Sequence, residues 1–154
     1  MRIAIFGTGG IGGYLAGKLG GLLERNDAEL SSLFLVARGK HLKALRKGGL
    51  TFIDTDGNEQ SVNPTAAADD FSEFGTVDVV FLCVKGYDLD AAVDEIAPGV
   101  SEETLVIPLL NGADIYERVR KRLENGIVLP AAIYISAAIT EPGTVQHKGG
   151  PGLV

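Results

Sequence analysis

The sequence has a single cysteine, Cys83, one methionine and no tryptophan in 154 residues. One thiol excludes an intrachain disulfide and a multi-thiolate metal site, and the two histidines stand far apart without ligand spacing, so we expect no metal. Cys83 lies in the apolar run VVFLCV, which predicts a small buried core residue. A lone thiol also fits a reducing, cytoplasmic setting.

Long apolar runs and an excess of basic residues are missing as well. No run approaches the roughly 18 residues of a membrane span, and the N-terminal MRIAIF breaks into glycines, unlike a signal peptide. The 14 basic residues against 20 acidic ones give a formal charge of −6, which argues against a nucleic acid or a membrane as partner. The length and the 45% hydrophobic content predict one globular domain spanning 1–154.

Short apolar runs alternate with segments of helical period, which is typical of βα units around a parallel sheet. Strands are expected at 2–6, 33–37, 77–84, 104–110, 127–129, 132–138 and 144–147, and helices at about 11–22, 39–48, 88–96 and 114–124. LTFI and EQSV flank the turn signal Asp56-Gly57, which predicts an inserted β-ribbon. The pattern predicts an α/β, Rossmann-type, doubly wound and mostly parallel sheet with helices on both faces. The ending GGPGLV lacks a capping element, as if cut in mid-course.

The turn Gly7-Thr8-Gly9-Gly10-Ile11-Gly12 matches G-x-G-x-x-G. In this motif the first glycine makes a tight turn, the second lets the backbone approach a pyrophosphate, and the third packs helix against strand. The pattern alone is weak in a chain with 21 glycines. It gains weight from its place, directly after an apolar strand and at the start of an amphipathic helix. We expect residues 7 to 12 to bind a dinucleotide, the alternative being a glycine-rich turn without a ligand.

Arg38 stands where NAD-specific sites carry an acidic residue, at the end of the second strand. A guanidinium offers paired donors for a phosphate, and Lys40 and His41 follow closely. We therefore expect NADP(H) rather than NAD(H) as the cofactor. The alternative is that Arg38 is a solvated charge at the strand end.

Two later strands end in polar residues at the edge where ligands gather in parallel sheets. VVFLCV ends in Lys85, which can reach a cofactor or an anionic substrate, or can be a solvated charge at a helix start. TLVIPLL ends in Asn111, which can bind ribose or nicotinamide, or can be an N-cap.

The segments IAIFGTGGIGGYLAGKL, LVARGKHLKALRKGGL, DVVFLCVKGYD, LLNGAD and EPGTVQHKGG together resemble the N-terminal domain of the 2-dehydropantoate 2-reductase (ketopantoate reductase) family. They follow the family's order over nearly the whole chain. The resemblance implies an NADPH-dependent reduction of ketopantoate to pantoate, on the route to pantothenate and coenzyme A.

The resemblance also implies roles for single residues. Gly7, Gly9 and Gly12 would hold the pyrophosphate and Arg38 the 2′-phosphate. Lys85 and Asn111 match residues that contact the cofactor in the family, and Asn111 also matches a substrate contact. Ala137, or a residue next to it in that segment, would lie against the nicotinamide half. The family's general-acid lysine belongs to a helical C-terminal domain and has no match here. We expect no catalytic residue in these 154 residues, and hence cofactor binding with little or no turnover.

Two other functions share parts of this pattern. A different two-domain dehydrogenase, of the hydroxyisobutyrate or glycerol-3-phosphate type, shares the first turn but not the strand ending in lysine followed by LLNG. A nucleotide-sensing regulatory domain usually carries an acidic residue where Arg38 stands. The exact 2-oxo acid and the oligomeric state stay open.

Overall fold

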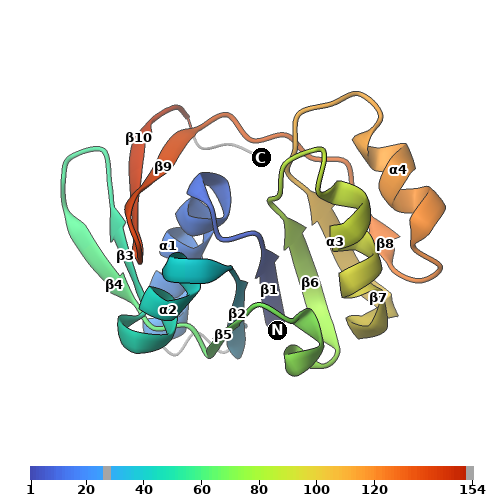
Figure 1. Ribbon diagram of the computed structural model, residues 1–154, viewed down its shortest axis with the longest axis horizontal. Coiled ribbons are helices and arrows are strands. Elements are labelled where there is room, and N and C mark those ends of the chain that lie inside the picture. The colour runs from blue at the N-terminus through green and yellow to red at the C-terminus, as the bar shows by residue number, and fades with distance from the viewer. Residues whose placement is uncertain (26–28, 152–154) are drawn as a thin grey trace.

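The computed structural model describes residues 1–25 and 29–151. Within them, six strands form a parallel sheet in the order β5-β2-β1-β6-β7-β8 (Figure 1). The strands are β1 (Arg2–Phe6), β2 (Ser32–Val36), β5 (Ala66–Ala68), β6 (Val77–Leu82), β7 (Val100–Pro108) and β8 (Ile127–Val128). The strand order reverses at β1, because β2 pairs with one edge of it and β6 with the other. The doubly wound fold expected from the sequence is confirmed.

Side chains of β1 alternate between two separate cores, one on each face of the sheet. The helices are α1 (Gly10–Glu24), α2 (Gly39–Gly48), α3 (Leu89–Ile96) and α4 (Ile115–Arg122), with 3-10 turns η1 (Phe71–Phe74) and η2 (Ala97–Gly99). Ile3 and Ile5 belong to the core with α1 and α2, whereas Ala4 and Phe6 belong to the core with α3 and α4. Both faces are therefore covered, as parallel strands require. In the described part of the chain, no helix has the length and apolar character needed to cross a membrane.

The expected β-ribbon is half of a second sheet. Its strands are β3 (Leu50–Ile53), β4 (Glu59–Val62), β9 (Ser136–Glu141) and β10 (Thr144–Gly149), in the order β4-β3-β10-β9. β3 pairs with β10 in parallel, with Thr51 opposite Thr144, so the two hairpins join although they are far apart in sequence. Figure 1 shows this sheet beside α1, at the end of the molecule away from α4.

One face of α1 is built from glycines, and the second sheet packs directly on it. The members of this glycine face are Gly10, Gly13, Gly17 and Gly20. A Cβ at these positions would collide in turn with Ala137 of β9, Val145 of β10, Phe52 of β3 and Val62 of β4. The helix thus crosses all four strands in their order in the sheet. Because any side chain larger than hydrogen would occupy the space of a neighbour, these glycines permit a close helix-to-sheet contact.

Two expected strands differ from those in the structure by more than two residues at an end. β7 begins at Val100 instead of 104, because Val100 pairs with Val77 before a bulge in which the Thr104 hydroxyl donates to the Val77 carbonyl at 2.7 Å. The polar residues of this bulge resemble a loop in sequence. Residues 132–135 form no strand; this segment links β8 to β9 (Figure 1). Its alternation reflects packing, since Ile133 and Ile135 lie against the core on one side only.

Candidate functional site

A cleft of about 330 Å³ opens at the carboxyl ends of β1, β2 and β6. It brings together three segments that sequence reasoning had selected separately: the glycine turn, Arg38 and Lys85. Gly7, Thr8 and Gly9 line it from the turn. Its position matches the switch point of the sheet, where ligands bind in open α/β folds.

Backbone hydrogen bonds hold the glycine turn against the end of β2. The amides of Gly7 and Thr8 both donate to the Val36 carbonyl, at 3.2 and 2.8 Å. The buried Thr8 hydroxyl donates to the same oxygen at 3.0 Å. Gly7 has a φ of 94°, a left-handed conformation in which a side chain would be strained. The turn is therefore set in shape by its own sequence and by β2.

Gly9 is the point of the turn that a ligand can approach. A Cβ at Gly9 would meet no atom within 4 Å. The first bond along α1 is donated by the Gly13 amide to the Gly9 carbonyl at 2.8 Å. The preceding amides, of Gly10, Ile11 and Gly12, come before that bond and have no partner within the helix, which suits an anion.

Gly10 and Gly12 also have packing roles that differ from ligand binding. A Cβ at Gly12 would collide with the Gly7 carbonyl and come within 2.9 Å of the Ile5 side chain, which is the helix-against-strand contact that the motif predicts. Gly10 lies against the backbone of Ala137. Ala137 is half-buried on β9 and does not line the cleft, but it lies next to the first residue of α1.

Arg38 lines the cleft with a side chain that is 71% exposed. Its Nη2 atom lies 3.7 Å from the Glu95 carboxylate on α3. The sequence shows no carboxylate near Arg38, so this neighbour is a finding of the tertiary structure. Glu95 is partly buried, but Arg38 is exposed and the two charged groups are too far apart for a hydrogen bond, so the pair contributes little free energy and the guanidinium is available to another anion.

His41 is a residue of this cleft that sequence reasoning placed only among basic neighbours of Arg38. Its Nδ1 atom accepts a hydrogen bond from the Gly143 amide at 3.0 Å, which ties α2 to the turn between β9 and β10. Burial lowers the pKa of His41 below its usual value, and a contact with the Thr8 backbone opposes this shift less strongly. The ring is therefore held neutral. The sequence signal that could have placed His41 in the cleft was its position three residues after Arg38, on the first turn of α2.

The loop after β6 carries Lys85 and Cys83 along the other wall of the cleft. The Lys85 side chain is exposed, and the Lys85 carbonyl accepts from the Asp88 amide at 2.9 Å. Cys83 follows the end of β6 at Leu82 and is half-buried: it packs against the core, as expected, and it also lines the cleft, which the sequence did not indicate. Burial raises the pKa of the Cys83 thiol well above its usual value.

Asn111 lies outside this cleft, in the exposed loop that follows β7. It is not the N-cap of α4, because that position is occupied by Asp114. The capping alternative is therefore wrong, and a ligand contact of Asn111 stays a prediction. The assembled cleft offers a glycine turn next to a helix N-terminus, a guanidinium and an ammonium group around apolar walls formed by residues such as Val36 and Ala91. Such an arrangement suits a phosphate-bearing ligand with an aromatic ring.

Known proteins are similar to this chain in both sequence and fold. Residues 3–154 match the family described as "Ketopantoate reductase PanE/ApbA". The chain is 34% identical to the 2-dehydropantoate 2-reductase of Mesorhizobium japonicum, over 97% of this chain and 50% of that protein. It is 31% identical to an uncharacterized oxidoreductase of Bacillus subtilis, over 96% of this chain and 45% of that protein. The solved 2-dehydropantoate 2-reductase from Porphyromonas gingivalis W83 is similar with a TM-score of 0.88 and 39% identity, over 97% of this chain and 52% of that one. This chain spans about half the length of the relatives that it matches.

Proposed function

The chain belongs to the ketopantoate reductase (PanE/ApbA) family, and from this premise we propose that it binds NADPH for the reduction of ketopantoate to pantoate. The family is one of oxidoreductases, since relatives are named 2-dehydropantoate 2-reductases. The proposed substrate is a small 2-oxo acid, and the step belongs to the route toward pantothenate and coenzyme A.

The observation that carries the proposal is the meeting of the glycine turn, Arg38 and Lys85 in one cleft. The amides at the start of α1, those of residues 10 to 12, bind the pyrophosphate, because a helix N-terminus favours an anion and the adjoining Gly9, which lines the cleft, leaves room for close approach. Arg38 binds the 2′-phosphate through paired donors, and Lys85 adds a second positive charge. The open space at Gly9 and the weakly paired Arg38 fit this cofactor.

Bound NADPH supplies a hydride, and reduction of a ketone also needs a proton for the oxygen, normally from a positioned acid. The lysine that fills this role in the family, according to the resemblance, has no counterpart among the 154 residues. Lys85 comes after β6 of the six-stranded sheet, and in this proposal it contacts the cofactor and does not supply the proton. These 154 residues therefore bind the cofactor and by themselves turn over little or no substrate. Asn111 and Ala137 reach the nicotinamide side.

Binding titrations of NADPH and NADH, by calorimetry or cofactor fluorescence, test the proposal. We expect tighter binding of NADPH, and we expect Arg38→Ala to weaken it about tenfold to a hundredfold, the value of one charge-assisted hydrogen bond. NADH affinity should hardly change. Lys40→Ala is the matched control, because Lys40 is an exposed neighbour that does not line the cleft. Equal losses for both cofactors in Arg38→Ala would contradict the role of Arg38, and no uptake of either would refute the proposal.

One observation favours a second candidate, an NAD(H)-dependent dehydrogenase of another 2-oxo or hydroxy acid. Glu95 lies 3.7 Å from Arg38, and a carboxylate near that site repels a 2′-phosphate. The same titrations separate the candidates, because this one requires tighter binding of NADH. A nucleotide-sensing module would instead bind NAD(H) or adenine nucleotides more tightly than NADPH.

A further inference from the structure

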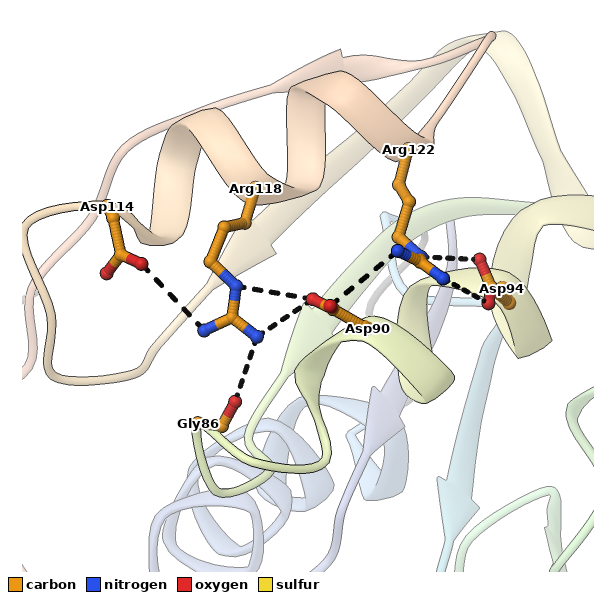
Figure 2. A network of polar contacts seen from close by, with 6 residues as sticks. All are labelled: Gly86, Asp90, Asp94, Asp114, Arg118 and Arg122. Atoms are coloured by element: carbon orange, nitrogen blue, oxygen red, sulfur yellow. Dashed lines mark hydrogen bonds and ion pairs between the residues drawn. The ribbon is translucent and has the colours of Figure 1, made fainter.

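The loop that carries Lys85 is tied to α4 through the side chain of Arg118. Figure 2 shows Arg118 between Asp114, Asp90 and the Gly86 carbonyl. The Arg118 guanidinium donates to the Gly86 carbonyl at 3.1 Å from Nη2. The same group donates to Asp90 Oδ1 at 2.8 Å from Nη2 and at 3.2 Å from Nε. One arginine therefore joins three elements: α4, the start of α3 and the loop between β6 and α3.

Packing does not hold this loop at its tip. A Cβ at Gly86 would meet no atom within 4 Å, and Tyr87 is 85% exposed. The Asp88 amide donates to the Lys85 carbonyl, which bends the loop but does not attach it to the rest of the fold. The hydrogen bond from Arg118 to the Gly86 carbonyl is charge-assisted and connects the tip of the loop to α4. Gly86 directly follows Lys85, which lines the cleft.

A second arginine on α4 provides an internal comparison. Arg122, one helical turn after Arg118, donates to Asp94 at 2.8 and 3.0 Å and lies 3.6 Å from Asp90 (Figure 2). It joins α4 to α3 as Arg118 does, but its contacts are all with α3 side chains. The two residues thus share a structural role between helices, and the contact with the loop belongs to Arg118.

We propose that Arg118 is a positioning residue for the cofactor site: by holding the Gly86 carbonyl it keeps the tip of the loop, residues 85–87, in place and directs Lys85 toward the cleft. This inference rests on the proposed function in so far as Lys85 contacts NADPH. Arg118 itself does not line the cleft, so its effect on binding must pass through Lys85. That requirement makes the proposal testable by coupling between the two residues.

The test compares Arg118→Gln with Arg122→Gln, each alone and in a Lys85→Ala background, by NADPH titration and by NMR hydrogen exchange. We expect Arg118→Gln to weaken NADPH binding about fivefold to tenfold, the effect of a displaced charged contact, and to speed exchange of the Asp88 amide. Arg122→Gln should change neither, although both variants lose a helix-to-helix ion pair and should melt at similar temperatures. In the Lys85→Ala background, Arg118→Gln should cause no further loss of affinity.

Equal losses of NADPH affinity in the two arginine variants, or an undiminished effect of Arg118→Gln without Lys85, would overturn the proposal. If the unaltered chain takes up no NADPH, the proposed function itself has failed. In that case hydrogen exchange decides alone, because it needs no cofactor. Faster exchange at Asp88 in Arg118→Gln only would support the loop tie, and unchanged exchange would overturn it.

Discussion

Replacing Gly13 by alanine should destabilise the chain, although alanine is the better helix former. In α1 the substitution gains about 0.5–1 kcal/mol of helix propensity. The new Cβ would lie 2.9 Å from Val145 Cβ and 3.0 Å from its Cγ1 atom, with Cγ2 closer still. Val145 is fully buried on β10 and cannot turn away. Overpacking costs about 1–3 kcal/mol, and three contacts this short place the cost in the upper half of that range, so we expect a net loss of about 1–2 kcal/mol.

The matched control is Gly21→Ala in the same helix. The nearest atom to a Cβ there is Nε2 of Gln60 at 3.2 Å, the far end of a flexible side chain. Only the propensity gain should remain, about 0.5–1 kcal/mol. Thermal melts followed by circular dichroism should therefore show a fall of about 2–8 °C for Gly13→Ala and a rise of about 1–4 °C for Gly21→Ala. Equal or higher stability of Gly13→Ala would refute a tight contact between α1 and the second sheet.

Two further predictions concern the titratable groups of the cleft. Burial lowers the pKa of His41 in the folded chain, so the unfolded chain takes up a proton first as the pH falls below the usual pKa of 6.5. The melting temperature should therefore drop between pH 6.5 and about pH 5, and it should drop less in the His41→Gln variant. An equal drop in that variant would show that another group is responsible. Because burial raises the pKa of the Cys83 thiol, a thiol reagent at about pH 8 should modify the native chain at least about tenfold more slowly than the urea-unfolded chain. Equal rates would contradict this environment.

Local signals were sufficient for the central part of the site. An apolar run followed by G-x-G-x-x-G and a helical period predicts β1, the turn and α1, because turn geometry and helix start depend on neighbouring residues. The Asp56-Gly57 hairpin between β3 and β4 is local in the same way. The meeting of Arg38 and Lys85 with the glycine turn followed from one general property, that parallel strands present their carboxyl ends at the same edge.

Other features depend on contacts between distant segments. The polar bulge of β7 is recognisable only when its partner Val77 is known, and residues 132–135 alternate like a strand but have no paired neighbour. Sequence spacing could not assign the extra glycines of α1 to packing, since their reason lies on β3, β4, β9 and β10. His41 likewise depends on Gly143, which comes from the turn between β9 and β10.

The sequence by itself determined the doubly wound fold, the turn at residues 7 to 12 and the basic residue after β2, because periodicity, turn chemistry and strand direction are encoded within short segments. Only the tertiary structure decided that Glu95 stands beside Arg38, that the ribbon joins a second sheet, and that Arg118 holds the Gly86 carbonyl. These contacts join residues that are far apart in sequence, and their distances are set by how helices pack on the sheet. A pattern within one segment carries no information on them.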